Sequence, residues 1–224
     1  MSVGKIAIQL LNGSFTSIMI FFLTLLFSLP LGLIVALLRL YGNKLVSGLI
    51  KLYISVMRGT PLMLQLMVVF FGPYYLFGIK IKTSYRFAAV IIGFVLNYAA
   101  YFAEIYRGGI EAVPKGQYEA AEVLGYSKTQ TFIRIILPQV IKTVLPSITN
   151  EVITLVKDTS LAFVIAVSEM FTQAKAIAAA QTTMMPFIIA GVFYYVFNFL
   201  VAFVMGRIEK KMEYGTAPAA MTRK

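Results

Sequence analysis

The sequence predicts an all-α membrane protein with five transmembrane helices and a cytoplasmic helix between the third and the fourth. Its 224 residues are 59% hydrophobic and only 13% charged, with a mean hydropathy of +0.83. A soluble domain of this size would expose far more charge. The apolar residues also fall into long uncharged runs separated by short polar and basic connections, which is the arrangement of a multi-pass helical protein.

Five apolar runs have the length that a membrane span requires. The first covers 15–38, and its 24 residues, at about 1.5 Å each, cross a hydrocarbon core about 30 Å thick. Pro30 within it predicts a kink, and residues 1–12 are expected on the membrane surface. The other four spans are expected at 59–79, 87–106, 138–167 and 186–206, with the fourth bent or broken near Pro146. A linker at 168–185 should contain a short helix at 176–180. We expect one transmembrane domain at 1–215 and a disordered tail at 216–224.

The basic residues indicate an orientation rather than a nucleic-acid partner. The net charge is +11, but the charges flank apolar segments instead of lining one face, as expected for contact with anionic lipid headgroups. If the loop after the third span is cytoplasmic, that side holds thirteen Lys and Arg residues against five on the other side. The positive-inside rule then places the N-terminus outside and the C-terminus in the cytoplasm.

Several residue types needed for catalysis are missing from the sequence. There is no cysteine and no histidine, which excludes disulfides, thiolate nucleophiles and the commonest zinc ligands. The sequence also lacks the G-x-x-x-x-G-K-[ST] loop that cradles nucleotide phosphates. We therefore expect a protein that is not an enzyme and that binds no metal or cofactor itself.

The loop at about 107–137 is polar, and its first half reads as a short helix. Good helix formers occupy 117–124, and Gly125 is placed to end the helix. Small side chains would let such a helix lie deep in the groove of a partner. An ordinary cytoplasmic loop would carry the same local features. The candidate coupling residues are Glu119, Ala120, Ala121 and Gly125.

Two spans carry polar stripes. Residues 97, 101 and 104 are spaced by four and three in the third span, and 147, 151, 154 and 158 step by four, three and four in the fourth, so each set shares one helix face. Polar groups in a membrane are costly and usually face a cavity or a partner; the alternative is that they hydrogen-bond between helices and hold the bundle together. Asp158 has Lys157 or Lys142 as alternative partners. The candidate substrate-binding residues are Asn97, Tyr101, Glu104, Glu151, Thr154 and Asp158.

The loop also fixes residue types over twenty positions: EAA at 119–121, Gly125, Ile135 and Leu137–Pro138. This pattern resembles the EAA loop of ABC-importer membrane subunits, which docks on the ATPase. Three further motifs are similar to those of the polar amino-acid uptake group within that family, and the resemblance covers about 13–212. These motifs are RGTPL at 58–62, VPKGQ at 113–117 and KDTSL at 157–161.

The resemblance implies an assembly in the bacterial cytoplasmic (inner) membrane. It implies a second permease subunit, identical (a homodimer) or homologous, and a separate ABC ATPase that holds ATP and Mg²⁺. It further implies an extracytoplasmic amino-acid-binding protein and import by alternating access. Glu104, Glu151 and Asp158 suit a cationic substrate such as arginine, lysine or histidine. Asn150–Glu151 could instead hold the α-ammonium of any polar amino acid.

Two other functions remain open on the sequence. An ion- or proton-coupled secondary transporter would use Glu104 or Glu151 as a relay, although five spans and a docking loop fit it poorly. A membrane scaffold would anchor a soluble partner through the loop, but it would have no use for buried polar stripes. Substrate-stimulated ATP hydrolysis by a reconstituted complex separates these alternatives from an importer.

Overall fold

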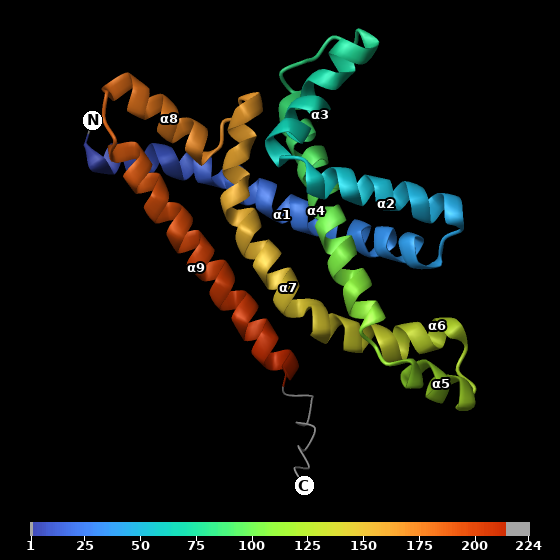
Figure 1. Cartoon of the computed structure of the whole chain (residues 1–224). Helices are drawn as coiled ribbons and strands as arrows, with labels where there is room; N and C mark the ends of the chain where they lie inside the picture. Colours follow the sequence, from blue (N-terminus) through green and yellow to red (C-terminus); the bar gives the residue numbers. More distant parts are fainter. Residues whose placement is uncertain (1, 214–224) are drawn as a thin grey trace.

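The computed structural model describes residues 2–213, and every regular element in that range is helical (Figure 1). The tail predicted to be disordered, 216–224, lies outside the described residues. The elements, with η1 a π-helix and η2 a 3₁₀-helix, are α1 (Val3–Tyr41), α2 (Lys44–Gly59), α3 (Leu62–Phe77), α4 (Tyr85–Glu111), α5 (Lys115–Val123), α6 (Lys128–Thr131), η1 (Phe132–Ile136), α7 (Leu137–Asp158), η2 (Thr159–Ile165), α8 (Met170–Gln181) and α9 (Met185–Glu213).

Four helical segments of the described chain are long and apolar enough to cross a membrane, namely α1, α4, α9 and the run from α6 through η2. A fifth candidate is the pair α2 and α3, whose axes meet at 112°. The start of α1 and the end of α9 lie at opposite ends of the bundle (Figure 1), which an odd number of crossings requires. Five spans therefore agree with the structure when the bent pair counts as one.

Helix α1 is longer than predicted. Residues 3–12, expected on the membrane surface, belong instead to one continuous helix of 39 residues that also runs through Pro30. Ile6 and Leu10 are buried against Met170 and Ala190. The surface expectation is wrong because it treated the mild apolarity of this stretch as lipid contact, whereas α8 and α9 cover it.

The second span differs from the predicted helix at 59–79 because the chain turns sharply between α2 and α3. Carbonyl groups at a helix end lack intrahelical partners, and a polar side chain satisfies them here. The Gln65 amide donates to the carbonyl oxygens of Met57 at 2.9 Å and Thr60 at 3.1 Å. Asn97 of α4 donates to the Gln65 side-chain oxygen at 2.9 Å. This network stabilises the bend and fastens it to α4.

Helix α4 is the centre of the bundle. Its aromatic residues Phe94, Tyr98 and Phe102 are buried in the main core. The helix also approaches α1 closely, since a Cβ built on Gly32 would lie 2.7 Å from the Cβ of Phe102. Small residues permit such close helix contacts in membranes. A larger residue at position 32 would push α1 away from α4.

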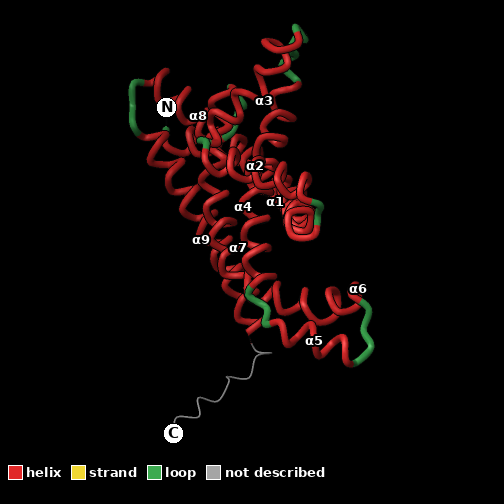
Figure 2. The backbone as a smooth tube through the Cα atoms, turned by 45° about the vertical axis from the view of Figure 1, so that its right-hand side comes forward, coloured by secondary structure: helices red, strands yellow, loops and turns green. Residues whose placement is uncertain are grey.

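Helix α7 continues through Pro146, where we expected a bend or break. Irregular geometry occurs at its ends instead, in η1 before it and η2 after it. The helix expected at 176–180 is the longer α8. In both views the α5–α6 hairpin projects from one end of the bundle, and α8 and the tip of α3 lie at the other (Figures 1 and 2). We name these the α5–α6 end and the α8 end.

Candidate functional site

The acidic residues predicted on α7 share a half-buried face that meets α4. Tyr98 donates a hydrogen bond of 2.7 Å to Oδ2 of Asp158. Glu151 lies about two turns before Asp158 on the same face of the helix. Thr154, between them along the helix, is exposed. Carboxylates inside a membrane span need a cation nearby, or a ligand that brings one.

Lys157 lies next to Asp158 along α7, and the cation near Glu151 is Arg58, at the end of α2. Its guanidinium lies 5.5 Å from the ring centroid of Tyr101, and its positive charge acts on Glu151. Its side chain is 44% exposed, so donor groups remain accessible. Sequence reasoning did not assign Arg58 to the site, although the residue opens the RGTPL motif. Arg58, Tyr101, Glu151 and Asp158 together present both charge signs to one region, which we call the zwitterion site.

Glu104 is not a free carboxylate. It forms ion pairs with Arg39 at the end of α1, with Arg58 at 3.4 Å and with Arg107 at 3.1 Å. Its side chain is only 18% exposed, and Arg107 also pairs with Glu111. The ends of α1 and α2 are therefore fastened to α4 by one shared carboxylate. In this conformation the Glu104 charge is compensated and not available to a cationic ligand.

Asn97 is also engaged elsewhere. It is 5% exposed and donates to Gln65 and to the Met57 carbonyl. The predicted spacing with Tyr101 and Glu104 is correct along α4, but the Asn97 side chain points to the α2–α3 bend. Of the six candidate substrate residues, the structure groups Tyr101, Glu151 and Asp158 and leaves Thr154 on the same α7 face.

The coupling-loop candidates lie on α5 and the turn after it. Gly125 has φ +78°, its N–H bonds to Glu122 O at 2.9 Å, and the Tyr126 N–H bonds to Ala121 O at 3.0 Å. This is a Schellman C-cap, in which glycine avoids the steric cost of the left-handed conformation. The prediction that Gly125 ends the helix is confirmed.

The exposed face of α5 carries apolar side chains. Glu119 and Ala120 face solvent, whereas Ala121 is 1% exposed and packs within the subunit. Val123 and Leu124, which sequence reasoning did not single out, are 87% and 73% exposed. Their signal was available in the sequence, because two large apolar residues end an otherwise polar helix. Exposed apolar residues on a projecting hairpin are typical of a protein-binding surface.

A further buried carboxylate lies at the α8 end. Glu169 is fully buried and accepts hydrogen bonds from the backbone N–H groups of Phe171 and Thr172 at 2.7 and 2.6 Å, which makes it the N-cap of α8. Ser17 of α1 and Tyr194 of α9 also donate to it. Burial raises the pKa of Glu169, and these donors oppose the rise. We see this group as structural, since it joins three helices.

No cluster of metal-ligating side chains occurs in the part of the chain that the structure describes. Residues 28–214 match the family described as binding-protein-dependent transport system inner membrane component. The chain belongs to this family. Permeases of this family are non-catalytic membrane subunits of ABC transporters, and ATP hydrolysis belongs to a separate subunit.

Individual relatives agree with the family assignment. The permease is 35% identical to a putative glutamine transport system permease protein, GlnP, of Rickettsia bellii. It is 37% identical to the arginine transport system permease protein ArtQ of Bacillus subtilis. In both alignments 91% of this chain and 92% of the relative are covered.

Solved structures support the same fold. The permease matches a chain in the crystal structure of an amino acid ABC transporter with histidines, with a TM-score of 0.81 and 31% identity. That match covers 91% of this chain and 94% of the other. A chain of the MetNI methionine ABC transporter in an inward-facing conformation matches with a TM-score of 0.69 over 95% and 99% of the two chains. At 16% identity, that likeness concerns the fold alone.

Proposed function

We propose that this permease forms the translocation pathway of an ATP-driven importer for polar amino acids, with some preference for basic ones. It works by alternating access, with its α5–α6 end in the cytoplasm and its α8 end outside. The relatives named for glutamine and arginine transport support the substrate class. The observation that carries the proposal is the zwitterion site, where Arg58 lies near Glu151 and Tyr98 holds Asp158 on the same face of α7.

The two charge signs match the two ends of an α-amino acid. Arg58 binds the α-carboxylate, because a guanidinium presents paired donors to a planar carboxylate. Glu151 holds the α-ammonium, and the Tyr101 ring positions Arg58. Asp158, held by Tyr98, is then left for the substrate side chain. A second acid beyond the one that balances the ammonium favours arginine, lysine or histidine over glutamine. Thr154 lines the same face of α7.

Asn97 and Glu104 support the site without touching substrate. Asn97 fixes the α2–α3 bend, and Glu104 holds the end of α2 on which Arg58 lies. Both therefore position Arg58. This division of roles replaces the expectation that all six polar residues contact the substrate.

The loop residues Glu119, Ala120 and Gly125, with Val123 and Leu124, contact the ABC ATPase. The exposed apolar pair enters a groove of that subunit, and the Gly125 cap sets the angle between α5 and α6. ATP and Mg²⁺ are bound by the ATPase. A second permease copy, or a homologue, covers apolar faces that this subunit leaves exposed, and an extracytoplasmic amino-acid-binding protein delivers the substrate.

An ion-coupled secondary transporter is the alternative, since the Glu151 and Asp158 pair could carry a proton. The exposed apolar tip of α5 has no role in such a protein. The two functions differ in one measurement. The permease is co-purified with its ATPase, reconstituted, and assayed for ATP hydrolysis with and without arginine or glutamine and the binding protein. An importer hydrolyses ATP faster with loaded binding protein, whereas a secondary transporter moves substrate without ATP.

The site itself is tested by Glu151→Gln, which keeps the volume of the side chain but removes its charge. Loss of a charge-assisted hydrogen bond costs about 1.5–3 kcal/mol, roughly tenfold or more in affinity. We expect that loss for both arginine and glutamine, and an additional loss for arginine alone in Asp158→Asn. Glu209→Gln, at the far end of α9, is the matched control. Unchanged affinities in both site variants would remove these carboxylates from the substrate site.

A further inference from the structure

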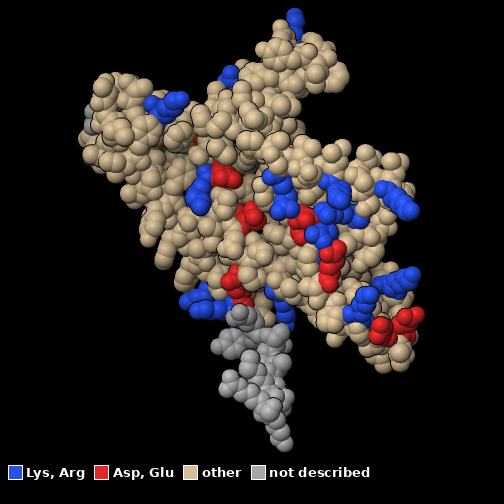
Figure 3. Space-filling view, viewed as in Figure 1, with Lys and Arg blue, Asp and Glu red and all other residues tan. Residues whose placement is uncertain are grey.

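Arg58 carries the surplus positive charge of the ion-pair cluster around Glu104. Glu104 pairs with three arginines, namely Arg39, Arg58 and Arg107. Arg107 also pairs with Glu111, so the cluster contains three arginines and two glutamates and has a net charge of +1. Figure 3 shows acidic and basic side chains next to one another over α2 and α4. Without Arg58 the cluster would contain two residues of each sign and be neutral.

Arg58 is also the arginine that Glu104 holds most weakly. Its Nη1 lies 3.4 Å from Oε2 of Glu104, whereas Arg107 donates to both oxygens of that carboxylate at 3.1 Å. The Arg58 side chain is 44% exposed, against 20% for Arg39 and 25% for Arg107. A long and exposed ion pair contributes little to stability. Arg58 can therefore leave Glu104 at the lowest cost of the three.

The backbone next to Arg58 is fixed without any help from Glu104. The carbonyl oxygen of the preceding residue, Met57, accepts hydrogen bonds from the Gln65 amide at 2.9 Å and from the Asn97 amide at 3.2 Å. These bonds fasten the end of α2 to α4. The guanidinium of Arg58 already lies against the zwitterion site. The side chain can thus turn between Glu104 and a ligand in that site while its backbone stays in place.

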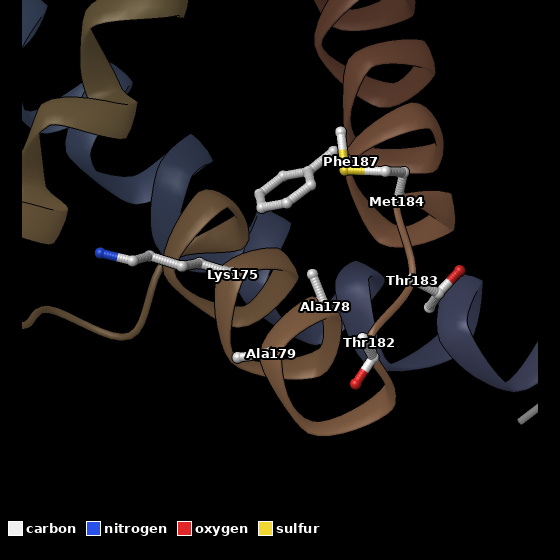
Figure 4. Close-up of a pocket in the computed structure, with 7 residues that line it drawn as sticks. All are labelled: Lys175, Ala178, Ala179, Thr182, Thr183, Met184 and Phe187. Atoms are coloured by element: carbon white, nitrogen blue, oxygen red, sulfur yellow. The ribbon is translucent and has the colours of Figure 1, made fainter.

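A groove of about 430 Å³ between α8 and the start of α9 is another place where a small ligand could lie. In Figure 4 the Phe187 ring and the Ala178 methyl group face the space between the helices, and the Lys175 amine points away from it. That amine lies over the Phe163 ring, 5.4 Å from its centroid. No acidic residue of the described range lines the groove. An amino acid therefore meets both charge signs at the zwitterion site and not in this groove.

We propose that Glu104 is an internal competitor of the substrate carboxylate, which holds Arg58 in the empty permease and recaptures it when the substrate leaves. This inference rests on the proposed function, in which Arg58 binds the α-carboxylate of an amino acid, and it adds how the site lets that carboxylate go. Glu104 and the substrate offer a guanidinium the same planar carboxylate. Two carboxylates beside one guanidinium also repel each other, so each weakens the binding of the other.

The position of Glu104 suits release towards the cytoplasm. Along α4 it follows Tyr101 by about one turn and precedes the connection to α5, which is the cytoplasmic side in the proposed orientation. While the substrate holds Arg58, Glu104 keeps Arg39 and Arg107 as counter-ions. Neither position of Arg58 leaves the Glu104 carboxylate uncompensated. When Arg58 returns to Glu104, the zwitterion site loses its partner for the substrate carboxylate.

The test measures equilibrium binding of arginine and agmatine to the purified permease–ATPase complex. Agmatine is arginine without its carboxylate, so it has no group that competes for Arg58. Glu104→Gln removes the competing charge, and we expect it to bind arginine about two- to fivefold more tightly, which is the worth of an exposed ion pair. Arg107→Gln makes Glu104 depend more on Arg58, so arginine binding should weaken. Glu209→Gln, on α9, is the matched control and should bind both ligands as the wild type does.

Both expected shifts oppose the general effect of the charge change, because arginine is a cation that a lost glutamate would disfavour and a lost arginine would favour. Agmatine, which has only positive charges, should follow the general effect. It should not bind more tightly to Glu104→Gln or more weakly to Arg107→Gln. The two variants thus separate competition for Arg58 from a change in the field at the site.

Weaker or unchanged arginine binding by Glu104→Gln would overturn the inference and leave the importer assignment intact. If that variant does not yield a folded complex, Arg107→Gln decides, because arginine binding equal to or tighter than that of the wild type would overturn the inference as well. A wild-type complex that binds neither arginine nor glutamine would overturn the proposed function together with this inference.

Discussion

The arginines around Glu104 and the basic residues of the α8 end have different surroundings. Towards the α5–α6 end, Arg39, Arg58 and Arg107 converge on Glu104, and Arg107 continues to Glu111. At the α8 end, lysines project without an acidic partner, and the one carboxylate there is occupied by backbone and hydroxyl donors. The paired charges are used inside the subunit to hold helices together. At the α8 end, by contrast, the Lys175 amine lies over the Phe163 ring, 5.4 Å from its centroid.

This contrast bears on how the permease couples its partners. The Glu104 cluster joins α1 and α2 to α4, and α4 leads directly to the α5–α6 hairpin. A displacement of the hairpin would therefore be transmitted through a charged network that also holds Arg58 at the zwitterion site. At the α8 end, by contrast, the helices are joined by hydrogen bonds from uncharged backbone and hydroxyl donors to Glu169.

The largest expected effect comes from breaking the inner cluster. Glu104→Gln leaves three arginines without their shared counter-ion, and removing one partner of a buried pair costs about 3–5 kcal/mol. Because these side chains are partly exposed, we expect about 2–3 kcal/mol, measured as a lower Tm of the purified complex. Glu111→Gln, which removes a single exposed pair, should cost less than about 1 kcal/mol. Equal Tm values for the two variants would contradict the assigned role of the cluster.

A second variant disturbs the other end. Glu169→Ala leaves several donors buried without an acceptor and removes the N-cap of α8, which costs about 1–3 kcal/mol. Glu169→Gln keeps one acceptor oxygen and should lose less. Because burial raises the pKa of Glu169, the folded protein takes up this proton at a higher pH than the unfolded chain does. The wild type should therefore gain stability relative to Glu169→Gln as the pH falls from neutral through that raised pKa. An identical pH dependence of Tm would contradict this.

A smaller effect on stability, with a clear functional readout, is expected at Gly125. Its φ of +78° costs a β-branched residue about 1–2 kcal/mol, so Gly125→Val should distort the α5–α6 turn without preventing insertion. ATP hydrolysis should then lose its dependence on loaded binding protein. Gly116→Val, within α5 and without a positive φ, is the control. Normal coupled transport by Gly125→Val would exclude the turn from the ATPase contact.

The sequence predicted features that depend on local pattern. The uncharged runs located α1, α4, α7 and α9 but not the bent pair of α2 and α3. The helix formers followed by Gly125 located α5 and its cap. The polar stripe on α7 was also correct, since spacing along one helix fixes its face.

Features that depend on contacts between distant segments could not be read in this way. Arg39 meets Glu104 across 65 positions, and Asn97 turns to Gln65 although its spacing placed it with Tyr101. The start of α1 was taken for a surface segment because nothing local reveals that α8 covers it. The structural role of Glu169 was not predicted for the same reason, since the residue lies in a linker rich in small residues.

The account depends most directly on which end of the bundle faces the cytoplasm. The chain contains no cysteine, so a single introduced cysteine can be labelled without background. Two exposed positions are suitable, Ser127 in the α5–α6 hairpin and Thr83 in the α3–α4 connection. We predict that a membrane-impermeant maleimide labels Ser127→Cys only when it has access to the cytoplasmic face, and Thr83→Cys only from outside. The reverse pattern would place the ATPase contact outside the cell, and would contradict the proposed function.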